Sequence, residues 1–306
     1  MQKHNFVKKT AKIFKISLLS LFLIGLFSCK TLPNQSKTKV NALDLLDYTN
    51  NFYLSVPTKT DPELVKRILQ SNVNGLSDED TKKLLERIDH TYIGLTRNWK
   101  NTTIQASANV NIPTKFLPTI LSKKKGWEKR VFTASEPASK YDVYAQNGME
   151  LCVPENSICC LGANMDYMIE KYNQIYNTPS DTVSEPNQSF SSLPKNIYDY
   201  LSGNDEVIRF YTVKPQTYLS MLIGTNINLQ LVTVCGEIRP DPQNKNMLLL
   251  DFVFEFKSEL VKKAGQALLS YTFALTNPEV SSDSPTVLKV SGIQLEKEAI
   301  YKLLVL

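Results

Sequence analysis

Hydrophobic positions form one nearly continuous run close to the amino terminus and short periodic groups along the rest of the chain. The run covers residues 16–27 and follows a basic region that contains five lysines, Lys3, Lys8, Lys9, Lys12 and Lys15. A basic region followed by a short apolar run is typical of a secretory signal. Because a permanent transmembrane helix needs roughly 20 apolar residues, this shorter run does not favour a lasting transmembrane span.

Short alternating and helical patterns follow one another in the first half of the remaining chain. Alternation and turn residues predict strands at 52–56, 90–96, 103–110, 127–134 and 141–146. Asp61 as an N-cap with Pro62 behind it predicts a helix over 61–70. Ser77 with Asp80 resembles a capping box and predicts a second helix to about residue 88. A third helix is predicted over 113–124.

The second half begins after a polar, loop-like interval at 177–192. We expect helices at 193–202 and from residue 215, and strands at 206–213, 226–238, 247–257 and 286–292. The turn-rich residues 239–246 make the two long strands beside them a hairpin. An amphipathic helix is predicted from Leu260, Ala264, Ala267, Leu268, Tyr271 and Leu275. Mixed helices and adjacent strands indicate an α+β class, mixed α/β with a largely antiparallel sheet.

One short pattern occurs twice. Leu54-Ser55-Val56-Pro57 is echoed by Leu151-Cys152-Val153-Pro154, and residues 92–96 are similar to 208–212. These echoes suggest a duplicated strand-helix-sheet unit that relates residues 50–146 to 149–293. The alternative is that Leu-x-Val-Pro is simply a common strand end. Superposition of the two segments, or a comparison of their strand order, would decide between the two interpretations.

These patterns divide the chain into five parts. Residues 1–28 are expected to be a signal peptide, and residues 29–47 to hold Cys29 and a polar tether. Residues 48–176 form an α+β domain or the first half of one. Residues 177–192 are a loop or boundary, and 193–306 form the second half. About 278 residues after the leader are enough for a well-buried core.

The end of the apolar run resembles the lipobox of bacterial lipoprotein precursors. Leu26, Ser28 and Cys29 match its pattern, whereas Phe27 stands at a usually small position, as in the relaxed boxes of spirochaetes. The resemblance implies that Cys29 carries acyl chains such as palmitate and attaches the protein to a membrane. It places the protein in the cell envelope, on the periplasmic face or at the outer membrane. The alternative is an ordinary cysteine beside an uncleaved anchor.

The charge balance changes once the leader is set aside. The chain carries 35 basic and 30 acidic side chains, a formal charge of +5. The leader holds five of the lysines and no acidic residue, so 35 − 5 = 30 basic side chains remain against 30 acidic ones. A neutral body whose longest basic run is Lys123-Lys124-Lys125 lacks the positive face that nucleic-acid binding requires. No nucleic-acid partner is expected.

Familiar catalytic and cofactor motifs do not occur in the sequence. Neither nucleotide fingerprint is present, and one histidine after the leader supplies no three-histidine or His-Glu-x-x-His metal site. We therefore expect no cofactor, no metal and no assigned catalytic residue. His90, which lies beside Asp89, is the one candidate residue that would support a hydrolase of unfamiliar type. A solvated or hydrogen-bonded histidine at a helix-to-strand junction is the alternative.

Four further cysteines would lie outside the cytoplasm, where disulfides are permitted. They are Cys152, Cys159, Cys160 and Cys235. A bond between the adjacent Cys159 and Cys160 would be strained, whereas Cys152 could pair with either of them. Cys235 lies in an apolar strand and could instead be a buried free thiol.

One stretch suggests membrane contact. Its apolar face consists of Phe116, Leu117, Ile120 and Leu121, and it ends in Lys123, Lys124, Lys125 and Trp127. Apolar and lysine-rich faces together are typical of a helix that rests on anionic lipid. The alternative is a core-facing helix whose carboxyl end is favoured by lysines.

The sequence thus predicts a lipid-anchored, non-enzymatic protein of the cell envelope, with the membrane as a partner through Cys29. It would act by binding a partner protein, an envelope component or an apolar ligand. Two alternatives remain. One is the exported hydrolase, and the other is a lipid carrier, which requires a large apolar cavity between helices and sheet.

Overall fold

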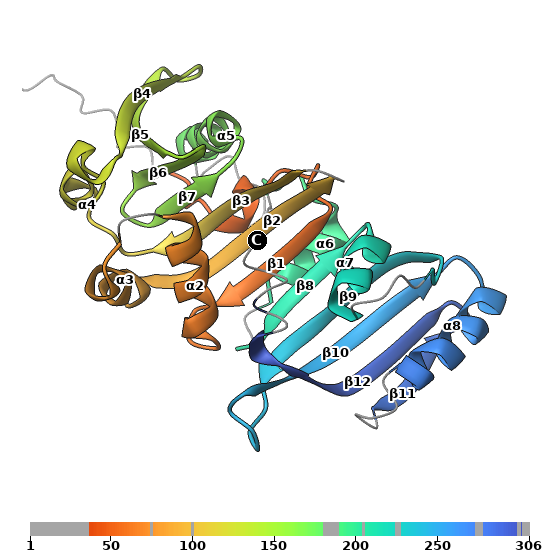
Figure 1. Cartoon of the computed structure of the whole chain (residues 1–306). Coiled ribbons are helices and arrows are strands. Elements are labelled where there is room, and N and C mark those ends of the chain that lie inside the picture. Colours follow the sequence, from red (N-terminus) through yellow and green to blue (C-terminus); the bar gives the residue numbers. More distant parts are fainter. Residues whose placement is uncertain are drawn as a thin grey trace, which may run out of the picture.

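The computed structural model describes residues 37–73, 76–98, 101–179, 190–203, 206–223, 228–272, 278–298 and 301. Within them the protein is α+β, as predicted, and is built on one antiparallel sheet (Figure 1). The order of strands across the sheet is β11-β12-β10-β9-β8-β1-β2-β3-β7-β6-β5-β4. Strands from both halves of the sequence therefore share a single sheet, joined where β1 pairs with β8.

The strands of the first half are β1 (Phe52–Pro57), β2 (Ile88–Asn98), β3 (Asn101–Val110), β4 (Glu128–Ala134), β5 (Ser139–Gln146), β6 (Met149–Glu155) and β7 (Ile158–Gly162). Those of the second half are β8 (Ile208–Thr212), β9 (Leu231–Pro240), β10 (Met247–Phe256), β11 (Glu279–Ser284) and β12 (Val287–Glu296). The predicted hairpin joins β9 to β10. Sequence patterns did not single out β7 or β11.

Helices cover both faces of the sheet. One face carries α2 (Pro62–Asn72), α3 (Asp78–Leu85), α4 (Leu117–Ile120), α7 (Pro215–Ile223) and α8 (Glu259–Thr272). The other face carries the 3₁₀ helix η1 (Ala42–Leu45), α5 (Met165–Asn177) and α6 (Lys195–Leu201). Each layer of helices encloses its own cluster of buried apolar side chains. Among the described residues, no helix is both long and apolar enough to cross a bilayer.

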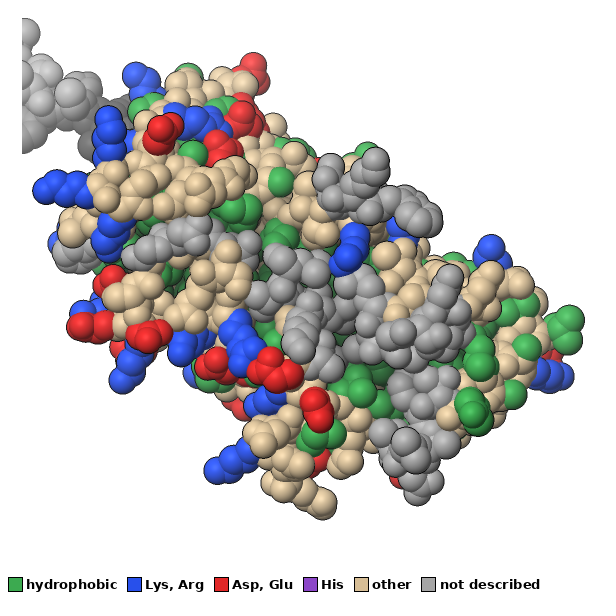
Figure 2. All heavy atoms as spheres, in the orientation of Figure 1, with side chains coloured by type: hydrophobic (Ala, Val, Ile, Leu, Met, Phe, Trp, Pro, Cys, Tyr) green, Lys and Arg blue, Asp and Glu red, His purple; other side chains and the backbone are tan. Residues whose placement is uncertain are grey.

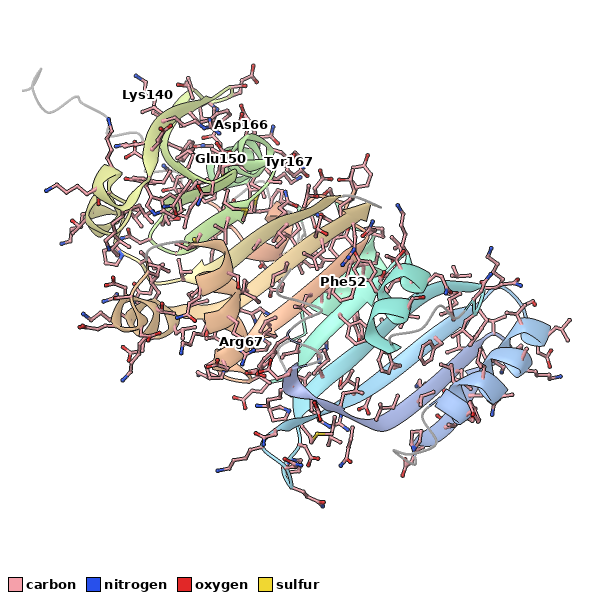
Figure 3. All side chains as sticks on the ribbon, viewed as in Figure 1. Phe52, Arg67, Lys140, Glu150, Asp166 and Tyr167 are labelled. Carbon is pink, nitrogen blue, oxygen red and sulfur yellow. The ribbon has the colours of Figure 1, made fainter. Side chains whose placement is uncertain are left out.

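Local capping chemistry places α2 and α3 as predicted. The Asp61 side chain accepts a hydrogen bond from the Leu64 backbone, and Pro62 occupies the first turn of α2. Ser77 caps α3 in the same way through the backbone of Asp80. Beyond β7, Arg130 binds both Glu150 and Asp166, which joins β4 to β6 and to the start of α5. Figure 3 labels these two acidic residues.

The single helix predicted over 113–124 is wrong. The segment consists of three short pieces, η2 (Thr114–Phe116), α4 and η3 (Lys123–Lys125). Pro118 lies inside the predicted helix and has no backbone N–H to donate. Ser122 is extended, and Gly126 ends the last piece in the left-handed conformation with φ 84°.

The strand order contains a duplication, but not the one predicted. The order β1-β2-β3-β7-β6 outward from the centre is repeated by β8-β9-β10-β12-β11. In both series a helical segment follows the first strand, and another follows the third. The predicted equivalence of residues 54–57 with 151–154 is wrong, because β1 lies at the centre of the sheet and β6 near its edge. The Leu-x-Val-Pro echo marks two unrelated strand ends.

Candidate functional site

Helix α8 packs on β10 and β12 through a narrow face. Leu269 is buried against the sheet, and a Cβ added at Gly265 would come within 2.3 Å of the Phe256 ring. Lys262 is also buried, and its Nζ donates hydrogen bonds to Ser282 Oγ (2.7 Å) and to the Ser284 carbonyl (2.8 Å). These contacts fix which side of the helix meets the sheet.

The opposite side of α8 presents apolar side chains to solvent. Leu260 is 79% exposed and Tyr271 is 83% exposed, and Leu268 lies between them at 38%. Ala264 and Ala267 are exposed on the same side. We call these five residues the α8 stripe. Figure 2 shows hydrophobic side chains on the surface at the end of the molecule that carries α8. The residues that predicted an amphipathic helix therefore face away from the core; Leu275 lies outside the described residues.

The stretch predicted to contact a membrane is placed differently. Leu117, Leu121 and Trp127 are buried in the core, and Ile120 is half-buried. Lys123, Lys124 and Lys125 remain exposed. The side chain of Phe116 lies outside the description. In this conformation Leu117, Leu121 and Trp127 contribute to the core and the three lysines face solvent. Membrane contact by this stretch stays a prediction.

An apolar cavity lies beneath α2 and α3, where a lipid carrier would need one. Its lining is almost wholly apolar and includes Val65, Ile68, Leu84, Ala106 and Leu161. Its volume is about 70 Å³. Small-molecule pockets usually measure roughly 300–1,000 Å³, so this cavity is too small for an acyl chain without movement of the helices above it.

His90 lies on β2 within reach of a serine, as a hydrolase would require. Its Nε2 is 2.7 Å from Ser55 Oγ. Ser55, however, is fully buried, and its hydroxyl donates to the Leu201 carbonyl at 2.9 Å. Since that hydroxyl has a single hydrogen, His90 must donate its N–H to Ser55. The pair thus ties β1 and β2 to the end of α6, and Ser55 is not a nucleophile open to a substrate.

The described residues contain no group of three His, Cys, Asp or Glu side chains arranged to hold a metal ion.

Most of the chain is similar to a known protein family. Residues 37–301 match the model of the family described as outer membrane-associated lipoprotein TP0453. The chain belongs to the TP0453 family. No curated protein matches it.

Crystal structures of TP0453 share the fold of this chain. Crystal form I is similar with a TM-score of 0.66 and 15% identity, over 88% of this chain and 98% of TP0453. Form III has a TM-score of 0.63 and 16% identity, with 87% and 98% covered. Form IV has a TM-score of 0.61 and 16% identity, with 88% and 98% covered.

Membership of the TP0453 family confirms the lipoprotein class and the envelope localisation that the amino-terminal residues predict. The protein is a membrane-anchored lipoprotein of the envelope. Cys29 lies outside the described residues, and its acylation stays a prediction.

The four cysteines of the TP0453-family body are free thiols in the structure. Cys152 and Cys160 lie opposite each other on β6 and β7, and both are fully buried. A disulfide between them therefore stays a prediction from the sequence. Burial raises the pKa of the Cys159 thiol to about 12 and that of Cys235 to about 11, and it raises the pKa of Cys152 and Cys160 as well.

We expect these thiols to resist alkylation in the folded protein, because the reactive thiolate is suppressed by burial. Iodoacetamide at pH 8 should label the mature body slowly and should label all four cysteines once the protein is unfolded. Intact mass after each treatment measures the number of labels. Only two labels in the unfolded, unreduced protein would instead show that two of the four cysteines form a disulfide.

Proposed function

We propose that this lipoprotein makes a second contact with the membrane through the α8 stripe, in addition to acyl chains on Cys29. The observation that carries the proposal is the exposure of Leu260 and Tyr271 on a helix that is otherwise anchored to the sheet. A helix with an apolar face that is left open is suited to lie in a bilayer interface. The membrane is the chosen occupant because the protein is already attached to one.

Charge on the helix is compatible with this contact. Lys257 and Lys263 are exposed on or beside α8, and Lys263 pairs with Glu259 at 2.9 Å. The helix is thus close to neutral around its stripe, so apolar burial rather than electrostatic attraction would supply the binding. Removing a Leu or an aromatic side chain from water stabilises by about 1.5–3 kcal/mol.

The proposal also sets the orientation of the body. The described residues begin at Lys37, which bridges to Pro179 just after α5. Helix α5 contacts β6 and β7, whereas α8 lies on β10 and β12. Seven steps in the sheet order separate β7 from β12, or about 34 Å at the usual strand spacing. Both the tether and α8 can meet one bilayer when the long axis of the sheet runs along the membrane surface.

Vesicle flotation of the unlipidated chain from residue 30 onward tests this function. Wild-type protein should float with vesicles of phosphatidylcholine and phosphatidylglycerol. Leu260→Ser with Tyr271→Ser should weaken that partitioning at least roughly 100-fold, because two buried apolar groups at about 1.5–3 kcal/mol each contribute about 3–6 kcal/mol. The melting temperature should stay within error, because both side chains are exposed.

The matched control replaces two apolar residues that are also exposed but lie elsewhere on the surface. Tyr48 and Val131 are both more than half exposed and lie outside α8. The Tyr48→Ser, Val131→Ser variant should bind vesicles like the wild type. Equal loss in both double variants, or no flotation of the wild type, would refute the role of the stripe.

A further inference from the structure

An open groove of about 880 Å³ lies on the first half of the protein, well away from α8. Five segments form its walls. They are the chain before η1, the turn between β1 and α2, the end of α3 with the start of β2, the end of β3, and the turn between β6 and β7. Its apolar floor includes Leu85, Ile88 and Val110.

Positive charge dominates the rim of this groove. Lys39, Lys59, Lys82 and Arg87 line it, and the carboxylates of Glu86 and Asp89 oppose them, which leaves 4 − 2 = +2. Arg87 donates to the Asn111 carbonyl at 3.1 Å. Among the described residues, the three lysines have no carboxylate within ion-pair distance. Three separate segments thus bring unpaired ammonium groups to one concave surface.

A buried hydroxyl in the same groove lacks a hydrogen-bond partner. Thr58 lines the groove and is 5% exposed, and its Oγ1 has no partner among the described residues. Its backbone N–H is already used, since it donates to the Asp89 carbonyl at 3.0 Å. A buried polar group that is left unsatisfied is rare, because its desolvation is not compensated. The Oγ1 atom itself has almost no accessible surface, so a ligand acceptor would satisfy this hydroxyl once the Thr58 side chain turns toward the groove.

Asn109 adds a further donor. Its side-chain oxygen accepts a hydrogen bond from the Ala42 backbone at 3.4 Å, which leaves its amide N–H groups available on the wall of the groove. Ammonium groups, a hydroxyl and an amide together match the oxygens of a compact polyanion. We propose that this groove binds a phosphate-bearing ligand.

The position of the groove allows two sources for the phosphate. Lys39 is ten residues from Cys29, a span of at most about 35 Å, so a lipid headgroup of the anchoring membrane is within reach if Cys29 carries the anchor. A free phosphate compound is the other source. The residues involved are separate from the α8 stripe, so this inference stands or falls independently of the proposed membrane contact.

Calorimetric titration of the unlipidated chain from residue 30 onward tests the site with inorganic phosphate, pyrophosphate, glycerol 3-phosphate and dihexanoyl phosphatidic acid. We expect saturable binding of pyrophosphate. Lys59→Gln with Lys82→Gln should weaken it at least about tenfold, the effect of losing a charge-assisted hydrogen bond. Tighter binding of phosphatidic acid than of glycerol 3-phosphate would identify a lipid headgroup, and equal binding a free phosphate; both outcomes support the site.

Thr58→Val separates a ligand site from simple charge attraction. The substitution keeps the shape of the side chain and removes only the unpaired hydroxyl, so the melting temperature should be equal or higher while pyrophosphate binding falls about tenfold. Lys123→Gln with Lys124→Gln removes the same charge elsewhere and should leave binding within twofold. Leu260→Ser with Tyr271→Ser should also bind pyrophosphate normally. Absence of saturable binding, wild-type affinity in Thr58→Val, or equal loss in the Lys123/Lys124 control would overturn the proposal.

Discussion

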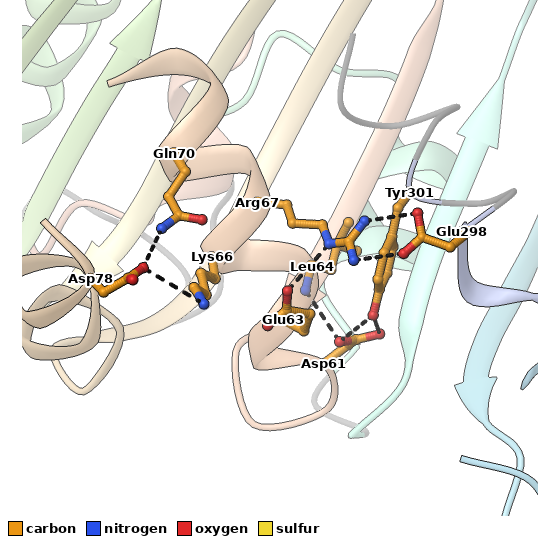
Figure 4. A network of polar contacts seen from close by, with 9 residues as sticks. All are labelled: Asp61, Glu63, Leu64, Lys66, Arg67, Gln70, Asp78, Glu298 and Tyr301. Carbon is orange, nitrogen blue, oxygen red and sulfur yellow. Dashed lines mark hydrogen bonds and ion pairs between the residues drawn. The ribbon is translucent and has the colours of Figure 1, made fainter. Parts of the chain in front are cut away.

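Asp61→Ala is expected to lower the free energy of unfolding by about 3 kcal/mol. The Asp61 side chain is 2% exposed, and it caps α2 by accepting the Leu64 N–H at 3.2 Å. It also accepts the Tyr301 hydroxyl, which lies 2.9 and 2.7 Å from its two oxygens (Figure 4). Alanine removes the cap, worth about 1 kcal/mol, and leaves a buried phenol without an acceptor, which costs about 1–3 kcal/mol more.

Urea unfolding of Asp61→Ala, Asp61→Asn, Tyr301→Phe and the Asp61→Ala, Tyr301→Phe double variant separates the contribution of the helix cap from that of the Tyr301 contact. Asp61→Asn keeps an acceptor for the cap and should lose less than Asp61→Ala. Tyr301→Phe removes the hydroxyl that Asp61→Ala leaves without an acceptor. Asp61→Ala should therefore lower the free energy of unfolding less in the Tyr301→Phe variant than in the wild type, with a coupling energy of about 1 kcal/mol or more. If Asp61→Ala lowers stability by less than 0.5 kcal/mol, on the scale of an ordinary surface change, the contact with Tyr301 is not formed in solution.

The same contact draws the end of the chain onto the first half of the fold. Glu298 makes two hydrogen bonds with Arg67 at 3.0 and 2.6 Å, and the Arg67 guanidinium lies 4.5 Å from the centre of the Tyr301 ring. Residues after β12 thereby hold α2, which roofs the small apolar cavity. Loss of the Asp61–Tyr301 contact should therefore loosen α2 before it loosens α8.

Acidification from pH 7 to pH 4 is expected to cost the wild type about 2–3 kcal/mol more stability than it costs His90→Gln. The pKa of His90 is lowered to about 4, chiefly by burial, with Asp89 opposing the shift and Arg209 adding to it. In the unfolded chain the imidazole titrates near 6.5. Between these values the unfolded state binds a proton that the folded state does not, so stability falls as pH falls.

Unfolding free energies of both proteins at pH 7, 6, 5 and 4 measure the difference. The two curves should be parallel above pH 7, where His90 is neutral in both states. They should separate between pH 6.5 and 4 and run parallel again at lower pH. Parallel curves throughout would show that His90 is open to water and not held by Ser55.

How far the sequence predicts this fold depends on the range of the interactions involved. Caps are local, so Asp61 and Ser77 marked the starts of α2 and α3 correctly. The β9–β10 hairpin is also local and was predicted. The duplication was placed on the wrong strands, because the Leu-x-Val-Pro echo records how a strand ends and carries no information about its neighbours.

The candidate sites also divide into features that local sequence predicts and features that depend on contacts between distant segments. Periodicity predicts the apolar residues of α8 but not the side that meets the sheet, since Leu269 lies on the side of the helix opposite Leu260 and Val261 lies between the two sides. Gly265 was the one local signal for the buried side. The groove around Thr58 depends on segments far apart in the sequence, and only the folded chain brings them together.

The central pairing of β1 with β8 has a consequence for how this protein matures. Leu54 lies opposite Phe210, so the middle of the sheet closes only when segments 156 residues apart meet. Contacts between such distant segments slow folding. An exported chain emerges amino terminus first, and β1 must wait with one edge unpaired until β8 has crossed the membrane. Unpaired edges of this kind promote aggregation. We therefore expect the protein to be most prone to aggregation between translocation of β1 and its pairing with β8.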